Sequence, residues 1–153
     1  MKNLITLLVV LLSAFPVAHS QNNPNTNPDA IVGVYKIVHK GDISKIRIYK
    51  CSDGSYEAQC IYLQDSIDKK TGKLRLDTKN PNKNLRNVPS NKVILITGMR
   101  YNAKKQRWDG GRIYDPLRGI HARCTCSFTD NNQLKLRGSV LGIGETIYWQ
   151  PIR

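Results

Sequence analysis

Apolar and polar residues alternate in short segments along most of the chain. This alternation is typical of strands that bury one face, and residues that favour turns, such as Gly, Asn, Asp and Pro, separate the segments. The predicted strands are Ile31 to His39, Lys45 to Cys51, Tyr56 to Leu63, Val93 to Arg100, Arg107 to Tyr114, Ile120 to Phe128, Leu134 to Leu141 and Thr146 to Ile152. The pattern therefore predicts an all-β fold of about eight antiparallel strands.

Closure of this sheet is the main question about the architecture. Strands joined by short turns leave two open edges unless the sheet closes on itself. Eight is also the number of strands at which a closed barrel fills its interior with side chains or holds one small ligand. We therefore expect an antiparallel up-and-down barrel that is lipocalin-like, and the alternative is a two-sheet β-sandwich.

The first twenty residues have the pattern of an export signal. Lys2 supplies a positive charge, Leu4 to Leu12 form an apolar run, and Ala18 to Ser20 form a small-residue cleavage site. The apolar run is shorter than the roughly 20 residues needed to cross a bilayer. Residues 1–20 are therefore predicted to be a signal peptide, and the mature protein is expected in the periplasm or outside the cell.

The remaining residues are expected to form one domain. Residues 21–28 are rich in Asn and Pro and are predicted to be a disordered lead-in, so the barrel domain is expected to span 29–153. One connection, 64–92, is long and basic. Long ordered loops are commonly lids or binding loops, and the alternative is a solvated flap. The basic residues that qualify for such a lid or polyanion-binding role are Lys69, Lys70, Lys73, Arg75 and Arg86.

The whole chain is strongly basic, with 24 Lys and Arg residues against 11 Asp and Glu residues and a formal net charge of +13. This charge favours anionic partners, such as an acidic surface or polymer. It also serves to keep a protein soluble. Charge alone does not decide between these two roles.

Four cysteines follow the predicted signal. On one strand, Cys124 and Cys126 would share a face with their side chains roughly 7 Å apart, which is too far for a disulfide. Exported proteins commonly form disulfides, and Cys51 and Cys60 flank one predicted hairpin. We therefore predict at least one intramolecular bridge and favour Cys51–Cys60, with a bridge from Cys124 to Cys51 or Cys60 as the alternative. The favoured bridge requires a wide loop between the two strands, because a tight turn at Asp53-Gly54 would leave the cysteines out of register.

Residues that could support catalysis are scarce. The only histidines after the signal are His39 and His121, and neither stands beside a nucleophile in a recognised catalytic pattern. His121 alternates with Cys124 and Cys126 across the strand, which argues against a zinc site made from all three. We expect no catalytic residues, no metal site and no cofactor.

A pair of glycines interrupts one predicted strand between two aromatic residues. Gly110 and Gly111 lie between Trp108 and Tyr114. Glycines inside a strand mark a bulge, a barrel corner, or close approach of a ligand or another backbone. A bulge or corner is the simpler of these interpretations.

Several blocks of residues, spread over nearly all of the chain after the signal, match the pattern of a known family. The blocks are Asp29 to Tyr35, Thr71-Gly72-Lys73, Asp77, Asn80-Pro81, Leu85-Arg86, Pro89, Trp108-x-Gly110-Gly111-x-Ile113-Tyr114-Asp115-Pro116-x-x-Gly119, Leu136-Arg137-Gly138 and Trp149. The chain resembles the secreted bacterial domain-of-unknown-function family 2147. The resemblance implies a lipocalin-like fold and carries over no catalytic residue. Family members usually have Trp at the position of Tyr35, and their first cysteine pair is closer together.

These observations favour a secreted, non-enzymatic protein that binds a small apolar or amphipathic molecule in its barrel. The expected ligand-binding residues are Tyr35, Trp108, Gly110, Gly111, Tyr114, Phe128 and Trp149. A protein or polyanion interaction module that acts through the basic surface is the alternative. An unrecognised hydrolase is the third hypothesis.

Overall fold

The fold is all-β. In the computed structural model, residues 23–39, 41–140 and 143–152 are described. The strands are β1 (Gly33–His39), β2 (Asp42–Lys50), β3 (Tyr56–Leu63), β4 (Ile94–Asn102), β5 (Arg107–Asp115), β6 (Ile120–Phe128), β7 (Leu134–Val140) and β8 (Ile143–Ile152). The short 3-10 helices are η1 (Pro24–Thr26), η2 (Pro28–Ile31), η3 (Lys83–Leu85) and η4 (Ser90–Lys92). Among the described residues, no helix is long and apolar enough to cross a membrane.

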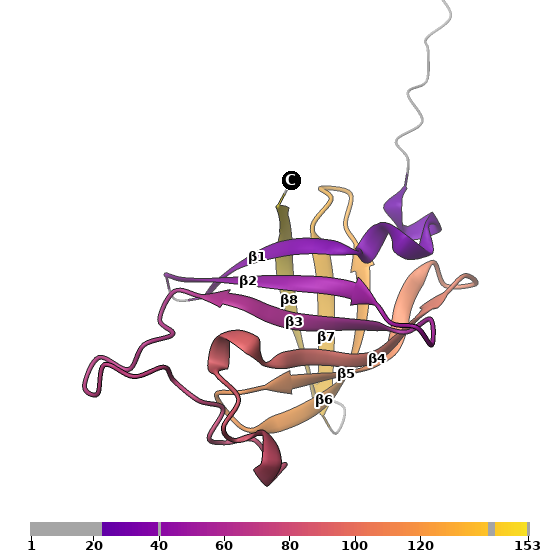
Figure 1. Ribbon diagram of the computed structural model, residues 1–153. Helices are drawn as coiled ribbons and strands as arrows, with labels where there is room; N and C mark the ends of the chain where they lie inside the picture. Colours follow the sequence, from indigo (N-terminus) through magenta and orange to yellow (C-terminus); the bar gives the residue numbers. More distant parts are fainter. Residues whose placement is uncertain (1–22, 40, 141–142, 153) are drawn as a thin grey trace, which may run out of the picture.

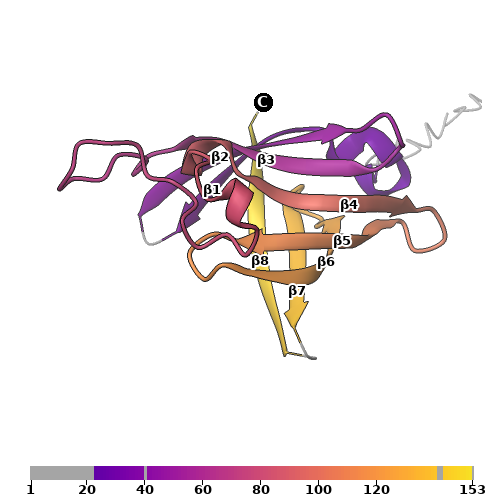
Figure 2. The same cartoon turned by 60° about the horizontal axis from the view of Figure 1, so that its bottom comes forward.

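The strands form one closed antiparallel barrel in the order β1 to β8, and β8 pairs back with β1. Figure 1 shows β1 to β4 running across the view while β7 and β8 stand behind them at a steep angle, and Figure 2 shows the same crossing from below. The expected up-and-down barrel is thus confirmed, and the sandwich alternative is wrong. Each turn joins neighbouring strands, so the order in the barrel is the order in the sequence.

The predicted strands agree with the observed ones to within a few residues. Two of them, β3 and β6, have the predicted bounds. The largest differences are at the starts of β2 and β8, which begin at Asp42 and Ile143. Both belong to hairpins whose pairing continues almost to the turn, with His39 opposite Asp42 in the first. The strand ends near these turns contain polar residues, so apolar alternation does not predict that pairing continues there.

Residues 23–31 cover one end of the barrel, which differs from the disordered lead-in predicted for 21–28. The amide of Asn25 makes two hydrogen bonds with the backbone of Phe128, donating to its carbonyl over 2.9 Å and accepting from its N–H over 2.7 Å. The indole of Trp108 donates to the carbonyl of Pro28 over 2.9 Å. These contacts fix a segment whose composition alone suggests disorder, because they satisfy backbone groups that strands leave open at the end of a barrel. Residues 21 and 22 lie outside the described residues.

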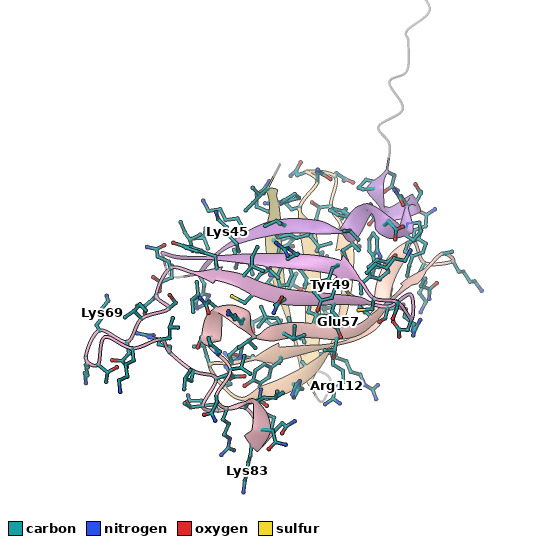
Figure 3. All side chains as sticks on the ribbon, viewed as in Figure 1. Lys45, Tyr49, Glu57, Lys69, Lys83 and Arg112 are labelled. Carbon is teal, nitrogen blue, oxygen red and sulfur yellow. The ribbon has the colours of Figure 1, made fainter. Side chains whose placement is uncertain are left out.

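The long connection 64–92 consists of two parts. The first, which we call the arm, is a narrow hairpin over Ser66–Arg75, closed by a 2.8 Å hydrogen bond from the Arg75 N–H to the Ser66 carbonyl. It projects away from the barrel, with Lys69 near its tip (Figure 3). The second, which we call the docked segment, spans Leu76–Lys92, includes η3 and η4 and returns along the barrel to β4. The connection is therefore not one uniform polar loop.

Candidate functional site

The half of the barrel nearest η1 and η2 is filled with side chains. Four of the expected ligand-binding residues meet there, and each is less than a tenth exposed: Tyr35, Trp108, Phe128 and Trp149. The rings of Tyr35 and Trp149 lie 6.2 Å apart, and those of Trp108 and Phe128 lie 5.9 Å apart. Such packed aromatic pairs stabilise a core. This half, which we call the closed half, forms the floor of the barrel interior.

One polar atom in this floor is unsatisfied. The side chain of Trp149 is almost fully buried, yet its indole Nε1 has no hydrogen-bond partner within the described part of the chain. The hydroxyl of the neighbouring Tyr35, in contrast, donates to the carbonyl of Ile31 over 2.7 Å. A buried donor without an acceptor is costly and uncommon in proteins, so this nitrogen calls for an explanation.

The other half of the interior, which we call the open half, is apolar but only partly covered. Ile37, Leu63, Ile113 and Ile147 pack against the core and remain partly exposed. The inward direction of Ile37, Ile113 and Ile147 follows from alternation with buried neighbours on the same strands, such as Tyr35 before Ile37. The register supports this, because Ile147 lies opposite the fully buried Leu136. Leu63 faces inward because a register shift between Lys45 and Ile46 exchanges the two faces at the end of β3. The interior therefore changes from a solid floor to an accessible apolar section.

The seam between β1 and β8 is short. Its residue pairs run from Val34 and Ile152 to Lys36 and Gln150, after which the two strands pair only with β2 and β7. Two apolar side chains beside the unpaired edges are strongly exposed: Val38 by 61% and Tyr148 by 51%. Apolar residues thus lie on both faces of the barrel wall where the seam ends.

The glycine pair forms a bulge in β5, as its position in the strand predicts. Trp108 lies opposite Cys126, but the next regular pair joins Gly111 and Cys124, so β5 holds one extra residue. Gly110 takes this position with a φ of +76°, a conformation that side chains with a Cβ resist. A Cβ at Gly111 would lie 2.9 Å from the Cys124 sulfur. Backbone geometry and core packing therefore account for both glycines.

Because of the bulge, Tyr114 lies on the outer face of the barrel and not with the other expected ligand-binding residues. Inward positions after the bulge are Gly111 and Ile113, so Tyr114 points outward. The docked segment covers it, and its hydroxyl donates to a buried Asp77 over 2.7 Å. Burial, followed by this hydrogen bond, raises the pKa of Tyr114. The sequence pattern missed this placement because a bulge reverses the faces of all later positions.

A second ring lies against Tyr114. The centroid of the His121 ring is 4.8 Å from that of Tyr114. Partial burial, followed by the positive charge of Arg112, lowers the pKa of His121. Asn80 completes the cluster by donating to Asp77 over 2.7 Å. One carboxylate oxygen of Asp77 thus joins the docked segment to β5, and the other is bonded within the segment itself.

The predicted Cys51–Cys60 bridge is not formed, and all four cysteines have free thiols. Residues 51–55 make a turn in which Cys51 donates to the Ser55 carbonyl over 2.8 Å, so Lys50 pairs with Tyr56 and Cys60 faces Ile46. The register therefore keeps the two cysteines apart. As predicted, Cys124 and Cys126 do not bridge each other. Burial raises the pKa of the thiols of Cys60, Cys124 and Cys126.

The basic residues expected to act together in the long connection are divided between its two parts. Lys69, Lys70 and Lys73 are exposed on the arm, where Arg75 forms a 2.9 Å ion pair with Asp65. Arg86 lies on the docked segment and donates to the Asn80 carbonyl over 2.8 Å. They do not form one patch.

Groups that could ligate a metal are dispersed. Within the described ranges, no set of three or more His, Cys, Asp and Glu side chains is close enough to hold an ion. The expected absence of a metal site remains a prediction.

Comparison with known proteins agrees with this architecture. In a solved structure, the protein HP1028 from the human pathogen Helicobacter pylori, which belongs to the lipocalin family, matches with a TM-score of 0.63 and 22% sequence identity. The match covers 80% of this chain and 83% of that one, and it shows that the fold is lipocalin-like. The comparison with curated proteins gave no match. Residues 33–151 match the model of a bacterial family, and the chain therefore belongs to the family described as "Uncharacterized protein conserved in bacteria (DUF2147)".

Proposed function

We propose that this chain is an exported, non-enzymatic binding protein that takes a small apolar or amphipathic molecule into the open half of its barrel. The observation that carries the proposal is the partial exposure of apolar residues that face the interior, namely Ile37, Leu63, Ile113 and Ile147. Removing such surface from water is favourable by about 25 cal/mol per Å² of apolar area. A ligand that covers these side chains therefore binds more favourably in proportion to the apolar area it covers.

The closed half determines how deep such a ligand enters. Trp108, Trp149 and Phe128 fill the interior there, so these residues act as the floor and do not line an empty cavity. A ligand bound in the open half therefore rests on the floor. The depth of the open half limits how much of the ligand the barrel can enclose. Gly110 and Gly111 support this floor through the bulge.

The unsatisfied indole of Trp149 favours an amphipathic ligand over a purely apolar one. If the side chains that cover it move aside, Nε1 of Trp149 would donate to a hydrogen-bond acceptor on the ligand, such as a carboxylate or carbonyl oxygen. The ligand would then satisfy a donor that is otherwise desolvated without compensation.

A binding role without catalysis agrees with the environments of the two histidines. His121 stacks on Tyr114, whose hydroxyl is already bonded to Asp77, and His39 lies at the exposed end of β1. Within the described residues, neither imidazole is hydrogen-bonded to a nucleophile or to an orienting carboxylate, which is the arrangement that acyl-transfer chemistry requires. Catalytic activity is therefore not part of the proposal.

Binding of a fluorescent apolar probe tests the proposal. N-phenyl-1-naphthylamine should gain fluorescence with the protein, and Ile37→Asn should weaken binding by about tenfold because it places a polar group on the interior wall. Val38→Asn is the matched control, since Val38 is the next residue on β1 but points outward. Equal losses in the two variants, or no binding by the parent, would contradict the proposal.

The amphipathic part of the proposal has its own test. Trp149→Phe should weaken binding of a dansylated fatty acid, which has a carboxylate, by several-fold, because one hydrogen bond contributes about 1 kcal/mol. Binding of N-phenyl-1-naphthylamine, which lacks such an acceptor, should fall much less. Equal losses for both probes would assign Trp149 a packing role only.

Export is tested separately. The predicted signal lies outside the described residues, so this part of the proposal depends on the sequence pattern alone. Mass spectrometry of the protein purified from cell fractions should find a chain that begins near Gln21. A chain that keeps residues 1–20 in the cytoplasmic fraction would contradict export.

A further inference from the structure

A basic groove lies on the outer face of β5, β6 and β7, away from the barrel interior. It has a volume of about 240 Å³, and its polar lining consists of Arg107, Arg123, Thr125, Arg137 and Ser139. The outward direction of the β6 and β7 residues follows from their alternation with buried Cys124, Cys126 and Leu136. Figure 3 shows a further residue of this face, Arg112, projecting outward from β5.

The register gives the groove its chemical character. Arg123 lies opposite Ser139, and Arg137 lies opposite Thr125, so two guanidinium groups and two hydroxyl groups occupy alternating corners of a β6–β7 patch. Guanidinium groups donate in a planar fork that fits the oxygens of a phosphate, and hydroxyl groups add further donors. This donor set fits a tetrahedral oxyanion.

Carboxylates balance only part of the positive charge on this face. Arg107 is paired with Asp109 over 3.2 Å, but Arg123 and Arg137 form no ion pair with any described residue. Arg112 lies directly opposite Arg123 on the same face, and like charges in that position destabilise a sheet. A bound anion would remove this repulsion.

We propose that this groove binds a phosphate group, carried either by a small phosphomonoester or by a lipid headgroup. Arg123 and Arg137 hold the phosphate oxygens, and Thr125 and Ser139 donate from the opposite corners. Arg107, whose guanidinium is held by Asp109, forms the wall of the groove nearest β5. The site is separate from the barrel interior, so the two can be occupied independently.

Charge-matched variants of the whole protein test the site. In a phosphate-free buffer, we would titrate the protein with glycerol phosphate by calorimetry and, in a second arm, with phosphatidylcholine vesicles that contain phosphatidic acid. Arg123→Gln with Arg137→Gln should weaken binding about tenfold or more, because two charge-assisted contacts are lost. Lys69→Gln with Lys70→Gln on the arm removes the same charge and should change binding by less than about twofold.

The two arms distinguish the source of the phosphate. Binding of glycerol phosphate that the groove variant loses supports a soluble phosphomonoester, and vesicle binding alone, lost in the same variant, supports a lipid headgroup. Equal losses in the groove and arm variants would show a general charge effect and overturn the site, as would no binding in either arm. Uptake of N-phenyl-1-naphthylamine should be unchanged in the groove variant, which separates this proposal from ligand binding in the barrel.

Discussion

The hydroxyl of Tyr114 donates a 2.7 Å hydrogen bond to the carboxylate of Asp77, and both side chains are less than a twentieth exposed. Asp77 belongs to the docked segment and Tyr114 to β5, so this bond joins the long connection to the barrel wall. The two residues also belong to separate blocks of the family pattern in the sequence. Their contact gives those blocks a common structural purpose.

Replacing Tyr114 with Phe should lower the free energy of unfolding by about 1–3 kcal/mol, because it leaves a buried carboxylate with one fewer donor. Urea denaturation followed by tryptophan fluorescence measures this change. Tyr49→Phe is the control, since Tyr49 also donates to a carboxylate, Glu57, over 2.7 Å but at a less buried site. A loss in Tyr114→Phe no larger than that in the control would show that the bond contributes little.

Much of this fold could be predicted from the alternation of apolar and polar residues. Alternation identified all eight strands and their order, because hairpins join neighbours and the barrel closes without a crossover. It failed at Tyr114, where one extra residue in β5 exchanges the two faces of the strand. The glycines at 110 and 111 signalled the bulge but not which later side chains it would turn outward.

Contacts between distant parts of the chain could not be predicted in this way. The order of residues 23–28 depends on hydrogen bonds between Asn25 and Phe128, which are 103 positions apart. The cysteine pairing depended on the width of the turn at 51–55, which sets the register of β2 and β3. The unsatisfied donor of Trp149 and the groove between Arg123 and Arg137 also arise only when strands are assembled.

Alanine at either glycine of the bulge should destabilise the barrel, for different reasons. Gly110→Ala should cost about 1–2 kcal/mol through its positive φ. Gly111→Ala places a Cβ 2.9 Å from the Cys124 sulfur and 3.1 Å from Cβ of Met99, so we expect a cost of about 1–3 kcal/mol from overpacking. Thermal denaturation measures both.

A second substitution separates the two causes. Cys124→Ala removes the sulfur that crowds position 111, so it should partly restore the stability of Gly111→Ala but not that of Gly110→Ala. Additive effects in the Gly111→Ala, Cys124→Ala double variant would contradict the packing explanation.

The thiols should react with an alkylating reagent in two groups. Thiolate is the reactive form, and burial raises the pKa of Cys124 to about 12, so very little of it is ionised at neutral pH. Cys60 and Cys126 are buried as well, whereas Cys51 is only partly covered. Peptide mapping after brief treatment with iodoacetamide should find Cys51 modified first, and the other three only after denaturation. Rapid modification of Cys124 in the folded protein would contradict its place in the core.

Acid should weaken the attachment of η2 to the barrel. Hydrogen bonds from Lys50 and then Tyr56 lower the pKa of Asp29 below its usual value of 3.8. A carboxyl group whose pKa is lowered by folding stabilises the protein fully above the pKa of the unfolded state. This stabilisation is lost as the pH falls through the pKa of the folded state. Asp29→Asn should therefore be less stable than the parent at about pH 7, and the difference should be smaller at about pH 2.

Asp130→Asn is a control for the acid experiment, because Asp130 forms no ion pair among the described residues. Its denaturation midpoint in urea should follow that of the parent at both pH values. A difference between Asp29→Asn and the parent that persists undiminished at low pH would assign the effect to something other than ionisation.

Deleting the arm should leave the barrel intact, whereas deleting the docked segment should not. The arm is closed on itself at Ser66 and Arg75, so a two-glycine turn in place of 67–74 keeps both ends in position. Replacing 77–91 with a flexible linker of equal length instead exposes Tyr114 and removes Asp77, which accepts its hydrogen bond. We expect the free energy of unfolding of the first variant to lie within about 0.5 kcal/mol of that of the parent. The free energy of unfolding of the second should fall by several times that amount. Circular dichroism during urea denaturation provides the comparison, and a large loss on deletion of the arm alone would show that the arm, too, is part of the folded core.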